Sequence, residues 1–167
     1  MIVGSIRARH VWIAVLVVVF DQVVKALIRG RLGLHESIVV IPGLFDLTRV
    51  HNSGAAFGML NAVDFPFKTV VIALLATGAL VGLTVYAASL EPEQTLTRYG
   101  LALVIGGAVG NLIDRVTAGY VLDFVVLYWR EWDFWAFNVA DAAINIGVAL
   151  MILELLGIGR QRVSRAA

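Results

Sequence analysis

Two aspartates in the C-terminal part of the chain are the residues whose type and spacing most clearly indicate a catalytic site. Asp141 stands in an apolar segment without a basic residue, on a polar stripe with Asn138 and Asn145 at i, i+3 and i+7. Asp123 lies in the loop that precedes this segment. Two carboxyl groups held close together cannot both ionise cheaply, so they share a proton. This is the arrangement of an aspartic protease, in which one aspartate activates water and the other protonates the scissile group. From spacing alone, a proton relay or a structural network remains open.

Further ionisable residues interrupt other apolar segments. Asp21 and Lys25 are spaced i, i+4, as are Asn111 and Arg115, with Asp114 beside them. An ionisable group inside a membrane span costs roughly 2.5–3.5 kcal/mol and therefore usually faces a partner inside the bundle. The spacing predicts an ion pair in the first set and a structural polar network in the second.

The sequence does not contain the motifs of other common catalytic sites. The histidines show neither H-x-x-x-H nor H-E-x-x-H spacing, and G-x-S-x-G, Ser-x-x-Lys, GxGxxG and Walker sequences are missing. The chain has 0 cysteines, and its formal net charge of +1 gives no basic field for a nucleic acid. These patterns give no support for a zinc protease, a serine hydrolase or a nucleotide-binding protein, and we expect no nucleic-acid partner.

The composition identifies the environment in which these polar groups must be positioned. Hydrophobic residues make up 60% of the chain and charged residues 15%, with a mean hydropathy of +0.88. Soluble domains carry about 25% charged residues, so the composition favours an integral membrane protein and excludes a disordered chain. Core helices of a soluble protein are the weaker alternative.

Four apolar segments are long enough to be transmembrane helices. Positions 69 to 90 carry no charge, and at ~1.5 Å per residue they can cross a ~30 Å hydrocarbon core. The predicted spans are about 11–28, 69–90, 98–117 and 138–157, and the outer loops are about 29–68 and 118–137. Together they form a single domain, 1–167.

The distribution of basic residues predicts the orientation of the spans. Lys and Arg are denser in the two termini and the 89–98 loop than in the other loops, which places both termini in the cytoplasm. Glu154 is then expected to extend to the inner surface. The first apolar segment lacks a cleavage site of the A-x-A type and is expected to remain as a span.

The outer loops have patterns of their own. Segment 36–52 alternates in places and is broken by Pro42-Gly43, which predicts two short strands around a turn. The following GAAFGML indicates a short interfacial helix or a turn. Segment 120–135 is rich in Tyr, Trp and Phe, which is typical of a platform at the membrane–water interface.

Five short blocks, in order along nearly the whole chain, resemble those of the bacterial signal peptidase II (lipoprotein signal peptidase) family. The blocks are Asp21-Gln-Val-Val-Lys25, His51-Asn-Ser-Gly-Ala-Ala-Phe57, Gly110-Asn-Leu-Ile-Asp-Arg115, Val121-Leu-Asp-Phe124 and Phe137-Asn-Val-Ala-Asp141. Each block is short, but five in register make the resemblance specific.

The resemblance implies an all-α polytopic protein of the bacterial inner membrane, with four transmembrane helices, a small extracytoplasmic β-cradle and a short amphipathic helix. It implies an aspartic endopeptidase, without cofactor, that cuts a prolipoprotein before its diacylglyceryl-modified cysteine, near the extracytoplasmic surface. Asp123 and Asp141 match the catalytic dyad. The positions that match substrate-binding or supporting residues are Asn52, Gly54, Asn111, Arg115 and Asn138. Those that match structural or second-layer positions are Asp21, Lys25 and Asp114.

Two other functions fit the composition. A small proton-coupled transporter or channel subunit would carry titratable groups through the depth of the membrane, whereas here they cluster toward one side. A non-catalytic membrane scaffold would keep its function when both aspartates are replaced by asparagine.

Overall fold

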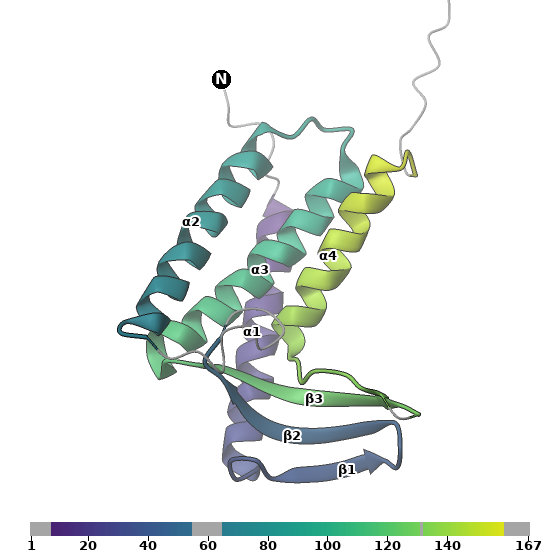
Figure 1. Cartoon of the computed structure of the whole chain (residues 1–167). Helices are drawn as coiled ribbons and strands as arrows, with labels where there is room; N and C mark the ends of the chain where they lie inside the picture. The colour runs from purple at the N-terminus through teal and green to yellow at the C-terminus, as the bar shows by residue number, and fades with distance from the viewer. Residues whose placement is uncertain (1–7, 55–64, 131, 159–167) are drawn as a thin grey trace, which may run out of the picture.

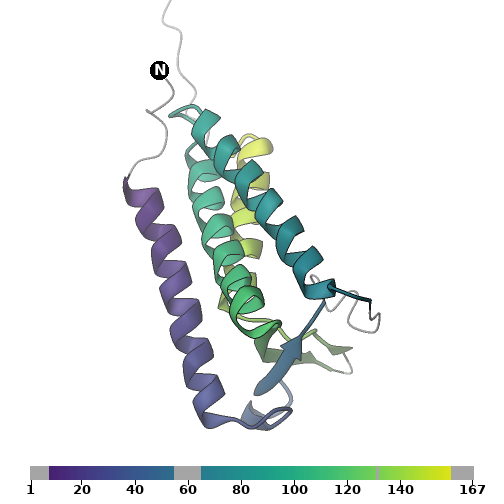
Figure 2. The ribbon, with the colours of Figure 1, turned by 90° about the vertical axis from the view of Figure 1, so that its left-hand side faces the viewer.

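The computed structural model describes residues 8–54, 65–130 and 132–158. Its four helices run side by side, and an antiparallel sheet lies across one end of the bundle (Figures 1 and 2). The helices are α1 (Ala8–Arg31), α2 (Lys68–Ser89), α3 (Thr95–Ala118) and α4 (Val139–Leu155). The strands are β1 (Ser37–Ile41), β2 (Phe45–Asn52), β3 (Val121–Trp129) and β4 (Trp132–Asp133).

Three of the helices, α1, α2 and α3, are long and apolar enough to cross a membrane. α4 has 17 residues, at the lower end of the ~17–25 residues that a span requires. The chain is therefore a helical membrane protein with a small sheet. The expected short amphipathic helix falls on residues 55–64, which lie outside the described residues.

The bundle has its polar groups inside and its apolar groups outside. Leu16 on α1 is 63% exposed and Leu75 on α2 is 70% exposed. Asp21, Lys25 and Asp114 are each 0% exposed. Lipid solvates the apolar surface, whereas buried polar groups must find partners inside the protein because the bilayer core offers none. The arrangement is that of a membrane protein and the reverse of a soluble bundle.

α3 is the central helix and contacts each of the other three. Its contact with α4 is close because glycines face backbone across the interface. A Cβ added at Gly107 would collide with the carbonyl oxygen of Ala140, and one added at Gly147 would collide with that of Gly100. Small residues at such positions let membrane helices approach to backbone contact.

The sheet is antiparallel in the order β1, β2, β3, β4. β1 and β2 form a hairpin that turns at Gly43, whose φ of 72° suits glycine. The two strands predicted in segment 36–52 are thus confirmed. In the β2–β3 register, Asn52 pairs with Val121 and Val50 with Asp123.

Two sharp transitions place β3 between α3 and α4. α3 ends at Ala118, and the next residue, Gly119, has a φ of 82° that turns the chain directly into β3. After β4, Asn138 caps the first turn of α4. Figure 1 shows β3 leaving α3 and leading back to α4 at the same end of the bundle. Residue 123 is on β3 and residue 141 in the first turn of α4, so both belong to elements at that end.

One expectation from the sequence needs correction. Glu154 does not extend to a surface: it is 3% exposed, and its carboxylate accepts hydrogen bonds from the backbone N–H groups of Thr97 and Leu96 at 2.8 and 3.4 Å. It thus satisfies the free N–H groups at the start of α3. The aromatic segment 120–135 contains β3 and β4, which the sequence analysis did not predict as strands. Trp129 and Trp135 are 62% and 70% exposed, as an interfacial platform requires.

Candidate active site

Asn138 connects the two aspartates of the candidate dyad. Its side-chain Nδ2 donates to Asp123 Oδ1 at 2.7 Å, and its Oδ1 accepts from the backbone N–H of Asp141 at 2.9 Å. Its own backbone N–H donates to Asp141 Oδ2 at 3.2 Å, which completes a reciprocal capping box. The residue that starts α4 therefore also sets Asp141 relative to Asp123 on β3.

Asn111 on α3 holds the other oxygen of Asp141. Its Nδ2 donates to Asp141 Oδ1 at 2.8 Å, and its Oδ1 accepts from Asn138 Nδ2 at 3.1 Å. The same Oδ1 accepts from Lys25 Nζ at 3.1 Å. This hydrogen bond fixes the orientation of the Asn111 amide, because the ammonium group can only donate.

Lys25 joins the site to the interior of the bundle. Its Nζ lies 2.8 Å from Asp21 Oδ2 and 2.9 Å from Asp114 Oδ2, so the ion pair expected from the i, i+4 spacing is one of two. With Asn111, these contacts use all three donors of the ammonium group. The two acidic partners also hold the backbone: Asp21 accepts from Ala140 N at 3.0 Å and Asp114 from Leu122 N at 3.1 Å.

Two members of this network were not identified from the sequence. Arg29 donates to Asp114 Oδ1 at 2.7 Å, and Gln22 Nε2 donates to the carbonyl oxygen of Gly110 at 3.1 Å. The signal for Arg29 was present, because Asp21, Lys25 and Arg29 follow one another at i, i+4 and i+8 on α1. Asn145, which was expected in the polar stripe, is exposed on α4 instead.

Asn52 approaches Asp123 from the neighbouring strand. Its Nδ2 donates to Asp123 Oδ2 at 3.0 Å, and its Oδ1 accepts from the backbone N–H of Gly54 at 3.0 Å. Arg115 donates to the carbonyl oxygen of Gly54 at 3.1 Å. The end of β2 is thereby tied to α3, and the guanidinium of Arg115 interacts electrostatically with both dyad carboxyls.

The environment of Asp123 favours its protonated form. The side chain is 3% exposed, and burial followed by the neighbouring negative charge of Asp141 raises its pKa from 3.8 to about 7. Hydrogen bonds from Asn52 and Asn138 act in the opposite direction and limit the rise. A carboxyl group that still holds its proton near neutral pH can serve as a general acid.

Asp141 differs from Asp123 in the groups that hold it. Both of its oxygens accept hydrogen bonds from N–H groups, one from Asn111 and one from the backbone of Asn138. It also stands in the first turn of α4, where the helix dipole favours a negative charge. The pair therefore offers a proton donor and a proton acceptor. Within the described ranges, no group of three or more His, Asp or Glu side chains could hold a metal ion.

Sequence comparison identifies one family. The model of a family described as signal peptidase (SPase) II matches residues 13–157. The chain is 46% identical to the lipoprotein signal peptidase of Symbiobacterium thermophilum over 149 residues, which cover 89% of this chain and 95% of the relative. It is 42% identical to the lipoprotein signal peptidase of Pseudomonas aeruginosa over 150 residues, covering 89% and 88%.

Structural comparison agrees with the sequence. A bacterial membrane enzyme solved by the in meso method at 2.3 Å resolution superposes with a TM-score of 0.82 at 32% identity, covering 95% of this chain and 94% of that one. A second, solved by the same method at 1.9 Å resolution, gives a TM-score of 0.80, also at 32% identity, with coverage of 89% and 92%.

Removing the central cation tests the buried network. We expect Lys25→Met to destabilise the protein by about 3–5 kcal/mol, because it leaves two buried acidic side chains without their ammonium partner. Unfolding in detergent micelles, followed by circular dichroism, measures the change. The control is Arg31→Met, which removes an exposed cation from the end of the same helix and should cost less than about 0.5 kcal/mol. Equal stability of the Lys25 variant and the wild type would show that the network does not hold the bundle.

Proposed function

Because the chain belongs to the signal peptidase II family, a family of aspartic peptidases in bacterial membranes, we propose that it cleaves lipid-modified prolipoproteins with Asp123 and Asp141 as its catalytic dyad. Family membership supports the substrate class. The bridge that Asn138 makes between the two carboxyl groups is the observation that supports the dyad. We further propose that the bond cut lies just before the lipid-modified cysteine.

The two aspartates have different starting roles in this proposal. Asp141, which stands in the first turn of α4 and accepts from Asn111 and from the backbone N–H of Asn138, is the ionised base. Asp123, whose pKa is raised to about 7, carries the shared proton. This division matches general acid–base catalysis by two carboxyls in unlike surroundings.

The reaction then follows in two stages, each with two proton transfers. Asp141 takes a proton from a water molecule as its oxygen attacks the scissile carbonyl carbon, and Asp123 gives its proton to the carbonyl oxygen. The tetrahedral intermediate collapses when the carbonyl reforms and the carbon–nitrogen bond breaks. The proton on Asp141 passes to the leaving nitrogen, and the proton of the intermediate's hydroxyl returns to Asp123. The steps need two carboxyl groups and one water.

The remaining polar residues orient these groups. Asn111 and Asn138 hold Asp141, and Asn52 and Asn138 hold Asp123. We propose that Arg115, held against Gly54 at the end of β2, also meets a carbonyl group of the substrate or the ester of its lipid. Asp21, Lys25 and Asp114 support the site through Asn111 and the backbone and make no proton transfer.

We propose that residues 1–167 work as one membrane domain with four spans, both termini in the cytoplasm and the sheet at the extracytoplasmic surface. The density of Lys and Arg on the terminal side supports this orientation. Alkaline phosphatase fused after residue 40 should be active, because it is active only outside the cytoplasm, and a fusion after Glu93 should be inactive. The reverse result would place the dyad on the cytoplasmic side.

Cleavage of a defined substrate tests the activity and the dyad together. Purified wild-type protein in detergent should cut a diacylglyceryl-modified prolipoprotein. Asp123→Asn and Asp141→Asn should each lower kcat/KM by at least about a hundredfold, because each removes one proton-transfer group. Asp46→Asn, on the far part of β2, is the matched control and should cut at the wild-type rate.

Two outcomes would contradict separate parts of the proposal. Wild-type rates in the Asp141→Asn variant would exclude the dyad while leaving the substrate assignment intact. Equal cleavage of an unmodified precursor by the wild type would exclude recognition of the lipid and leave the dyad intact.

A further inference from the structure

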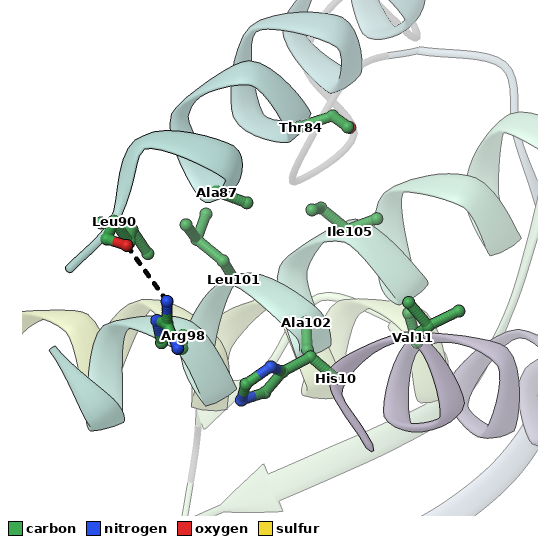
Figure 3. A pocket seen from close by; sticks show the side chains of 10 residues that line it. His10, Val11, Thr84, Ala87, Leu90, Arg98, Leu101, Ala102 and Ile105 are labelled. Atoms are coloured by element: carbon green, nitrogen blue, oxygen red, sulfur yellow. Dashed lines mark hydrogen bonds between the residues drawn. The ribbon is translucent and has the colours of Figure 1, made fainter. Parts of the chain in front are cut away.

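A cavity lies at the end of the bundle opposite the sheet (Figure 1). It has a volume of about 180 Å³, is lined by residues of α1, α2 and α3 and is open on one side. Most of its lining is apolar, including Val11, Ala87, Leu101 and Ile105. Figure 3 shows the lining running from Leu90 and Arg98 at one end toward Val11 and Ile105 at the other. A cavity of about 150 Å³ with apolar walls is large enough to take up a small hydrocarbon.

Arg98 is the charged residue of this cavity. It is 5% exposed, and one terminal nitrogen donates to the carbonyl oxygen of Leu90 at 3.1 Å. Its Nε is buried without a hydrogen-bond partner. In the part of the chain that the structure describes, no carboxylate lies within ion-pair distance of this guanidinium. A buried cation without a counter-charge is costly, so the site fits an anion supplied from outside the protein.

We propose that this cavity binds a membrane glycerophospholipid, with its phosphodiester against Arg98 and part of one acyl chain between α1, α2 and α3. The fork of N–H groups on a guanidinium matches the oxygens of a phosphodiester. Basic pockets between membrane helices bind lipid head groups in this way. The proposal concerns the end of the bundle opposite the dyad and does not rest on the proposed function.

The position of the cavity favours a lipid over a soluble anion. From Arg98 to Ile105 the lining follows α3 for seven residues, or roughly 10 Å, into the apolar part of the bundle. Val11, at its edge, is 51% exposed on the surface that faces the membrane. A second cation stands at the same level, because Arg9 lies over the ring of Tyr99 at 5.4 Å. A soluble anion would use the charge and leave the apolar walls unfilled.

Binding can be measured with the full-length protein in detergent after its endogenous lipid has been washed away. The probes are palmitoyl-oleoyl phosphatidylglycerol, the diacylglycerol with the same chains, and sodium phosphate. We expect the phospholipid to raise Tm saturably and to give a one-to-one complex in native mass spectrometry. The diacylglycerol and the phosphate should do neither at the same concentration. An equal effect of phosphate would reduce the cavity to a plain anion site, and an equal effect of diacylglycerol would exclude a role for Arg98.

Three variants separate the two halves of the site. Arg98→Gln should weaken the apparent Kd for the phospholipid by about tenfold or more, because it removes a charge-assisted hydrogen bond. Ala87→Phe leaves the guanidinium intact and fills the cavity, and it should weaken binding similarly. If the Arg98 variant does not fold, this variant alone tests whether the phospholipid binds in the cavity. Arg31→Gln removes an exposed cation at the opposite end and should bind as the wild type does. Unchanged affinity in either cavity variant would overturn the proposal.

Discussion

The rest of the molecule depends on the interactions that the ammonium group of Lys25 makes inside the bundle. This group is 0% exposed inside an apolar bundle, and it contacts Asp21, Asp114 and Asn111 within 3.1 Å. A charge at this depth is tolerated only if every donor is used and the charge is balanced. Two carboxylates and one amide meet that requirement, and Arg29 supplies a further cation to Asp114. The apolar surface of the helices is then free to face lipid.

The same network positions the candidate dyad. Asp21 accepts from the backbone of Ala140 at the start of α4, and Asp114 accepts from the backbone of Leu122 at the start of β3. The two elements that carry Asp141 and Asp123 are therefore fixed by the carboxylates that Lys25 holds. Asn111 and Asn138 extend the hydrogen bonds from the ammonium group to both catalytic candidates. The buried charge cluster and the proton-sharing pair thus form one continuous set of polar groups. Within it, burial and the charge of Asp141 raise the pKa of Asp123, and hydrogen bonds from two amide groups limit the rise.

Much of this arrangement could be predicted from the sequence, and the missed parts have physical reasons. Long apolar runs predicted the helices, and the break at Pro42-Gly43 predicted the β1–β2 hairpin, because both signals are local. β3 was missed because its pairing with β2 is a contact distant in sequence, and its aromatic composition also suits a membrane interface. Glu154 was misplaced for a similar reason: its partners are backbone N–H groups of α3, which no pattern around residue 154 reveals. The shared role of Asn138 as helix cap and bridge likewise depends on where β3 lies.

The pH dependence of kcat/KM, compared between the wild type and Asn52→Ala, tests most directly whether Asp123 is the proton donor of the dyad. Activity should fall on the alkaline side with a midpoint near the pKa of Asp123, about 7, because its proton is lost there. The hydrogen bond from Asn52 stabilises the ionised form, so its removal should raise that pKa further and move the alkaline limb to higher pH. Ser37→Ala, on β1 away from the dyad, should leave the profile unchanged. An alkaline limb that coincides in the wild type and Asn52→Ala, or activity that stays constant through neutral pH, would contradict this assignment.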